Sequence, residues 1–492
     1  MDIRTDLDER LSEVVAEIPT PTKAYADRAA KQAVRRDALT RAVPQAAPIP
    51  IPIPVPPLPI SRGARVLMWK QDPTVKEIGI REAFLPGRVF TGPKDARLVV
   101  QGISPPVSPN VLGDLIIDPV ANPAAFDAVH TFAVVRQTLT MYERHLAPKK
   151  VPWQWNTGTN VDPLNVFPHA GVTMNAFYSR NQKALKFFFF NTPTPPPAHD
   201  VFTCRSLDIV AHETGHAILD GLKPGWLNAG NPPQTGGLHE SFGDLTAIFL
   251  ALSQFDLVES IIAHTKANLH DKSFLPNLAE EFGEALGKPN GLRNADNDLK
   301  LSQVGTEVHA ISQVFTGGVY DVLADIFAFE RKPIAKDDSA ILYSVGRYVA
   351  SLVLRAIIAA PGIQATFADV VNKMIQIVQS DGKPTEYKSS IVNRFTLREV
   401  LAPSALELAA HEGVEFAPGI QDEHGALQDR SRCCGTMQHE EYLGEGDSLE
   451  AEMQEIAANF VKSPNGAKPA TRARSTSSRS TSRSSSRKST RK

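Results

Sequence analysis

Apolar residues are spaced differently in the two halves of the chain. Between about residues 61 and 120 they form short runs, such as 64–69 and 96–101, separated by proline and glycine. This spacing predicts short strands and turns. Residues 170–191 alternate and favour a strand or hairpin, whereas residues 124–146 have helical periodicity. The N-terminal half is therefore predicted to mix strands with helices.

Beyond residue 240 the pattern becomes helical. The apolar periodic stretches lie near residues 241–266, 309–330, 338–360, 366–379 and 396–412. The pattern decays past about residue 415, where one short helical candidate remains near 448–462. We therefore predict an α+β protein with a mixed N-terminal part and a helical C-terminal part.

The two ends of the chain differ from its middle. Residues 1–46 are polar and predict a short helix or disorder, and residues 47–60 alternate proline with apolar residues, which favours an extended linker. Residues 471–492 are rich in serine and arginine and predict a disordered tail. The boundaries that we predict are 1–46, 47–60, 61–225, 226–412, 413–470 (an irregular extension) and 471–492.

Composition narrows the class of protein. The 492 residues carry a net charge of -2, so the chain as a whole does not suggest a dedicated nucleic-acid site, although the tail holds eight Arg or Lys and could bind anionic partners. Three cysteines, two of them adjacent, do not form a disulfide framework. We find no Sec signal peptide and no apolar run that predicts a membrane span, and expect a cytoplasmic protein, with export by a non-Sec route as the alternative.

The candidate chemistry begins at His212-Glu213-Thr214-Gly215-His216, an H-E-x-x-H sequence inside a mostly apolar segment that predicts a helix. Residues four apart share one helix face, so His212 and His216 can offer two imidazole nitrogens to one zinc ion. Glu213 lies at the edge of that face and can take a proton from a zinc-bound water. Two ordinary helical histidines are the alternative interpretation.

A second motif can complete the site. Glu240 and Asp244 are four residues apart on a predicted helix, so Glu240 can be the third zinc ligand while Asp244 accepts the second ring N–H of a ligating histidine. His239 is a rival ligand, but it points about 100° away from Glu240 on a helix. We therefore rank His239 below Glu240.

Together these motifs resemble the thermolysin-like zinc metallopeptidases, the gluzincins with H-E-x-x-H and a downstream E-x-x-x-D. Two further stretches match in the family's order: Met174–Tyr178 is similar to its N-A-F-[WY] strand, and Val308–Ser312 to its V-H-x-x-S. The resemblance covers about residues 61–412. It implies a two-lobed fold, with a β-rich N-terminal lobe, a helical C-terminal lobe and the zinc helix between them.

The resemblance also assigns roles. It implies that the strand containing Asn175, Ala176 and Tyr178 binds the backbone of a peptide substrate. It implies that His309 hydrogen-bonds the oxyanion that develops at the scissile carbon. The function implied is a zinc-dependent metalloendopeptidase with one catalytic Zn²⁺, in which Glu213 is the general base.

Three departures from the family pattern stand out. The interval between His216 and Glu240 is about four residues longer, and the extra residues fall in a predicted loop at 230–237. The family's oxyanion tyrosine should fall near Trp226 or Leu227, where an indole N–H could substitute. Asp208 matches one calcium-ligand position, but Ala251 replaces an expected acid, which makes calcium doubtful.

Two other functions stay open. A zinc-binding scaffold with little peptidase activity is the main alternative, because the oxyanion tyrosine is missing. The basic tail could instead make this a nucleic-acid-associated protein, in which case binding would be sensitive to salt. We regard the tail as an accessory to the enzyme.

Overall fold

The computed structural model describes residues 63–402, apart from residues 229 and 289. The predicted terminal segments, 1–46, 47–60, 413–470 and 471–492, therefore lie outside the described residues. The described chain is a mixed α and β structure whose C-terminal region is helical, as the apolar pattern predicts.

The strands of the N-terminal half are short and form several small sheets. The largest sheet has the order β3-β4-β6-β5, in which β4 runs parallel to both β3 and β6, while β5 pairs antiparallel with β6. In the described part of the chain, β5 is thus an edge strand. The strands are β1 Gly63–Trp69, β2 Ile80–Pro86, β3 Leu98–Val100, β4 Leu164–Phe167, β5 Ala176–Ser179, β6 Ala184–Phe187, β7 Phe189–Thr192, β8 His199–Phe202, β9 Asn277–Leu278 and β10 Arg293–Asn294.

Most helices follow these strands in the sequence. The α-helices are α3 Pro123–Leu146, α4 Leu207–Leu222, α5 Pro233–Leu252, α6 Phe255–Thr265, α7 Glu280–Ala285, α8 Val308–Glu330, α9 Asp338–Ala359, α10 Phe367–Ser380 and α11 Thr385–Leu397. The 3₁₀ turns are η1 Thr203–Arg205, η2 Pro224–Leu227 and η3 Leu301–Gln303.

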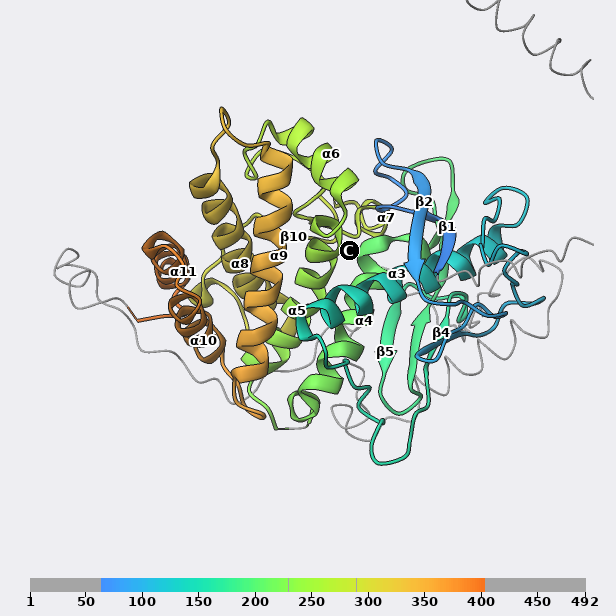
Figure 1. Cartoon of the computed structure of the whole chain (residues 1–492), viewed down its shortest axis with the longest axis horizontal. Coiled ribbons are helices and arrows are strands. Elements are labelled where there is room, and N and C mark those ends of the chain that lie inside the picture. The colour runs from blue at the N-terminus through green and yellow to red at the C-terminus, as the bar shows by residue number, and fades with distance from the viewer. Residues whose placement is uncertain (1–62, 229, 289, 403–492) are drawn as a thin grey trace, which may run out of the picture. The chain divides into compact units, whose positions relative to one another are not determined.

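Helices α4 and α5 lie at the centre of this arrangement. Figure 1 shows α8 to α11 on one side of them and the strands β1, β2, β4 and β5 on the other. Helix α4 packs against α3, α5 and β5, and α5 packs in turn against α8. Both central helices are buried along nearly their whole length, so any side chain between them is held by packed neighbours on every side.

The helical predictions are largely confirmed, with three corrections. The stretch at 241–266 is two helices, α5 and α6, which meet at an angle of 93° across Ser253 and Gln254. The loop predicted at 230–237 is shorter, because α5 already begins at Pro233, where proline suits the first helical position. The helix predicted at 396–412 is not found over its described residues 396–402, because α11 ends at Leu397, and residues 403–412 lie outside the described residues.

Helix α9 is long and apolar enough to cross a membrane by length and composition alone. However, 61% of its apolar window is buried inside the structure, where it packs against α5, α6, α8 and α10. Burial of this kind is typical of a core helix, whose apolar residues contact other side chains rather than lipid.

Candidate zinc centre

Local sequence explains where the H-E-x-x-H helix begins and ends. Ser206 is the N-cap of α4, and its hydroxyl accepts a hydrogen bond from the backbone N–H of Ile209. Asp208 adds a negative charge to the first turn, and Pro224 follows the C-cap. His212, Glu213 and His216 are all buried in the middle of this helix, at most 3% exposed.

Glycine allows α4 and α5 to approach each other at the site. A Cβ atom on Gly215 would lie 2.8 Å from the side chain of Thr246, and one on Gly243 would lie 2.6 Å from the ring of His212. Neither position has room for a methyl group without movement of its neighbours. This close approach brings Glu240 of α5 to both histidines of α4.

Glu240 completes the group that the sequence predicts. One carboxylate oxygen lies 3.4 Å from Nε2 of His212, and the other lies 3.5 Å from Nε2 of His216. The donor atoms of these three residues are all within 4.8 Å of one another. His309, at the start of α8, joins them with its Nε2 3.3 Å from Glu240.

Unpaired donor atoms are the strongest sign that this group fits a metal. Among the described residues, Nε2 of His212, His216 and His309 and both oxygens of Glu240 have no hydrogen-bond partner, although all are buried. Buried polar atoms rarely go unpaired without a reason. Two imidazole nitrogens and a carboxylate are the ligand set of many catalytic zinc sites, so the residues present fit a zinc ion.

The charges around these atoms also fit a cation. Burial lowers the pKa of His216 to about 3, which leaves a neutral ring with a free lone pair. Burial opposes protonation of His212 as well, but Asp244 and Glu240 outweigh it and raise its pKa well above the usual value. Burial works against an ionised Glu240, yet the surrounding histidines hold its pKa well below the usual range. The pocket thus favours positive charge beside Glu240.

Each histidine is oriented through its other ring nitrogen. Nδ1 of His212 lies 2.9 Å from Asp244, as predicted. Asp244 is in turn held by the guanidinium of Arg293, which donates to both of its oxygens. Such outer partners fix the ring direction and the tautomer of a ligand.

The other two rings have partners that the sequence did not reveal. Nδ1 of His309 lies 2.5 Å from Glu307, whose carboxylate also caps α8 by accepting from the backbone N–H groups of His309 and Ala310. Nδ1 of His216 lies 2.7 Å from Nδ1 of His239. His239 is therefore not grouped with the predicted ligands but stands behind one of them.

Glu213, the predicted general base, is fully buried on α4, directly after His212. Burial raises its pKa to about 8, although the backbone amide of Tyr178 and the charge on His212 favour the ionised form. Within the described part of the chain, both carboxylate oxygens are buried without a well-formed hydrogen bond.

The predicted substrate strand passes next to this base. Ala176 and Tyr178 lie in edge strand β5, which packs on α4, and Asn175 immediately precedes it. The side-chain oxygen of Asn175 accepts from the N–H of Ala176. The hydroxyl of Tyr178 donates to Asp220, 2.7 Å away, so this side chain is directed into the protein interior. Any contact of Tyr178 with a substrate would therefore be made by its backbone.

The suggestion that Trp226 supplies an oxyanion donor is wrong. Its indole Nε1–H donates to the carbonyl of Pro361 at 2.8 Å, and the residue is 1% exposed. The same 3₁₀ turn is fixed by Asn231, whose side-chain amide donates to the carbonyls of Gly225 and Trp226. The indole N–H is therefore already used in packing the turn.

Asp208 lies in an acidic cluster at the start of α4. Burial and neighbouring carboxylates raise the pKa of Asp208 to about 8 and also raise that of Glu280, while burial raises the pKa of Asp72. Ala251 contributes no ligand, and among the described residues these acids do not bring three donor atoms within 4.8 Å of one another.

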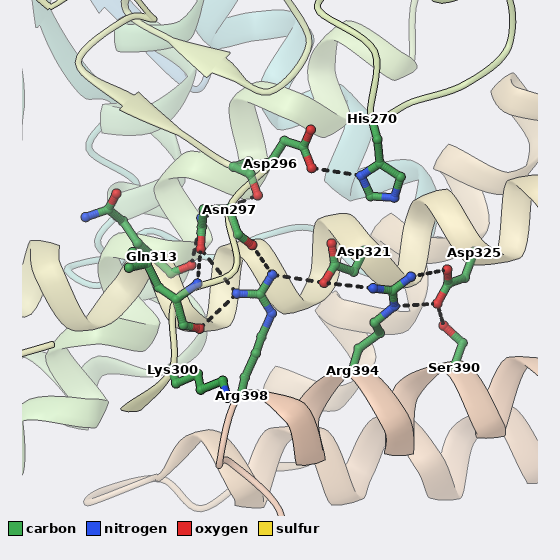
Figure 2. A network of polar contacts seen from close by, with 12 residues as sticks. His270, Asp296, Asn297, Lys300, Gln313, Asp321, Asp325, Ser390, Arg394 and Arg398 are labelled. Atoms are coloured by element: carbon green, nitrogen blue, oxygen red, sulfur yellow. Dashed lines mark hydrogen bonds and ion pairs between the residues drawn. The ribbon is translucent and has the colours of Figure 1, made fainter. Parts of the chain in front are cut away.

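In two other groups of potential metal-binding side chains, a carboxylate is already paired with arginine. His270, Asp296 and Asp321 approach one another, but Figure 2 shows Arg398 and Arg394 directed at Asp321 and at Asp325. This network joins α8 to α11. In the second group, of Asp127, His169 and Cys204, both oxygens of Asp127 accept from Arg205. Of these three groups among the described residues, the one around Glu240 has buried donor atoms that are left unpaired.

Comparison with known proteins adds no assignment: no protein-family model matches the chain, and no curated protein is significantly similar to it.

Proposed function

We propose that this protein is a zinc-dependent endopeptidase, with His212, His216 and Glu240 as the zinc ligands. The observation that carries the proposal is the convergence of unpaired, buried donor atoms from these residues beside a buried carboxylate, Glu213, and an edge strand. The order of the motifs, which resembles that of thermolysin-like peptidases with their two-lobed fold, supports the same function.

A bound zinc ion would polarise the scissile carbonyl and acidify the attacking water. Glu213 accepts the proton of that water and transfers it to the leaving amine. Burial, together with the charge of Glu240, raises the pKa of Glu213 to about 8, so a cation bound nearby would favour the ionised base at neutral pH. The zinc ligands and the base are thus interdependent.

His309 and β5 position the substrate. With Nδ1 held by Glu307, His309 directs Nε2 toward the pocket, where a ring that carries both protons can donate to the oxyanion. As the edge strand of its sheet, β5 could pair with an extended peptide as an added strand. Peptide or protein substrates in extended conformation fit this arrangement.

Trp226 gives one specific reason to keep a second candidate, a zinc scaffold with little activity. Since its indole is bonded to Pro361, His309 is the oxyanion donor that we can name among the described residues. Removal of one such donor typically slows an enzyme by about 10²–10³ in kcat. Turnover is therefore expected to be slow compared with an enzyme that has both donors.

Cleavage of an unfolded protein such as casein, with the wild type and Glu213→Gln assayed side by side, tests the proposal. The variant keeps the shape of the side chain but cannot accept the proton. We expect cleavage by the wild type alone, with equal zinc content in both proteins. Equal cleavage by the variant would refute the assigned base, and stoichiometric zinc without any cleavage would favour the scaffold.

A further inference from the structure

His216 differs from the other two histidines of the site in the partner of its Nδ1 atom. That partner is another histidine, His239, rather than a carboxylate. The two Nδ1 atoms lie 2.7 Å apart, and the rings stack with centroids 4.8 Å apart. His239 is fully buried on α5, directly before the ligand Glu240. At this distance one ring must donate a proton and the other must accept it.

Only one of these two arrangements suits a metal. If His216 donates from Nδ1, its Nε2 is bare and lies 3.5 Å from Glu240, where the ion would bind. If His239 donates instead, a neutral His216 must carry its proton on Nε2, and that atom can no longer be a ligand. The tautomer of His239 therefore decides whether His216 can bind zinc.

Carboxylate partners do not present this choice. Asp244 and Glu307, when ionised, can only accept, so Nδ1 of His212 and Nδ1 of His309 must each carry a proton. If the partner behind His216 were also a carboxylate, it would add negative charge to a pocket that already buries Glu213, Glu240 and Asp244. A neutral imidazole accepts the same hydrogen bond without that charge.

We propose that His239 is a positioning residue, which accepts the Nδ1–H of His216 and thereby holds its Nε2 ready for zinc. The inference rests on the proposed zinc site and names the residue that tunes it. His239 touches neither the substrate nor the ion in this account and acts through His216 alone.

Substitutions on α5 in the full-length chain can isolate this role. His239→Asn keeps an acceptor at nearly the same place, because the amide oxygen of asparagine stands at the position of Nδ1. His239→Leu removes the acceptor while filling much of the space. Ser241→Ala, also on α5, is the matched control. It removes a buried hydrogen bond from the Ser241 hydroxyl to the carbonyl of Ser312 on α8, but Ser241 has no part in orienting His216.

Zinc affinity, measured by competition with a chromophoric chelator, is the first readout. We expect His239→Leu to bind zinc about 10–100-fold more weakly, as for other lost outer partners of metal ligands. His239→Asn and Ser241→Ala should stay within about threefold of the wild type. Wild-type affinity in a folded His239→Leu would overturn the inference, whereas a wild type that binds no zinc would overturn the proposed function itself.

Histidine ¹⁵N chemical shifts of the zinc-loaded wild type give a second readout, which does not depend on whether His239→Leu folds. We expect a protonated Nδ1 and a metal-bound Nε2 in His216, and an unprotonated Nδ1 in His239. A proton on Nδ1 of His239 in the loaded protein would contradict the assigned direction of the hydrogen bond and overturn the inference.

Discussion

Replacing Gly243 with alanine would place a methyl group against the ring of His212, a proposed zinc ligand. An ideal Cβ at this position lies 2.6 Å from Cε1 and Nδ1 of His212. Non-bonded carbon atoms pack at about 3.5 Å or more, so the ring would have to retreat by about 0.9 Å. Metal–ligand distances hold to within about 0.2 Å, so this shift is several times what the zinc bond tolerates.

The expected loss is therefore in metal binding rather than in folding. Alanine is favoured over glycine inside a helix by about 1 kcal/mol, so α5 itself should not be weakened. We expect the zinc affinity of Gly243→Ala to fall by at least about 10–100-fold, a range typical of lost support around a metal ligand, with helix content unchanged. Competition with a chelator measures the first quantity, and far-ultraviolet circular dichroism the second.

Gly346→Ala is the matched control. Its Cβ would lie 2.9 Å from Cβ of Leu252, at the far end of α5 and about 18 Å along the helix from Glu240. It introduces similar crowding without touching a ligand, so its zinc affinity should equal that of the wild type. Unchanged affinity in a folded Gly243→Ala would refute the argument that α4 and α5 must meet at glycine to form the site.

Two further predictions follow from the charges. Glu307→Gln leaves His309 without a carboxylate partner, so kcat should fall by about tenfold or more with little change in KM; a change in KM alone would argue against the role of His309. For Asp208, the pKa of about 8 in the folded protein lies above its ordinary value, so folding stability should decline as pH rises from about 4 to 8. Asp208→Asn should make this decline smaller and raise Tm at pH 8 but not at pH 4, which thermal unfolding at the two pH values can check; equal shifts at both would contradict it.

The features that sequence could predict are those encoded within a few residues. The periodicity of α3, α4, α8, α9 and α10 identifies each helix, and the four-residue spacing of His212 and His216 places them on one face. The structure then brings Glu240 and Asp244 to them, as the motif spacing predicts.

The features that sequence missed depend on residues far apart in the chain. Arg293 is 49 residues from its partner Asp244, and nothing in the short strand β10 marks it as part of the site. Glu307 could have been noticed, because an acid before a helix is a capping signal, but its second bond to His309 depends on a side-chain direction. Helix α11 was misplaced because its sequence, TEYKSSIVNRFTL, is mostly polar and its buried face is narrow.

The most direct test of the account is a zinc titration of the full-length chain after removal of metal by a chelator, with hydrolysis of an unstructured peptide measured at each step. We predict that activity is absent without metal, rises in proportion to added zinc and saturates at one ion per chain. In Glu240→Gln, one equivalent of zinc should not restore it. Full activity in the metal-free protein, or wild-type activity in Glu240→Gln at one equivalent, would contradict a zinc centre built from His212, His216 and Glu240.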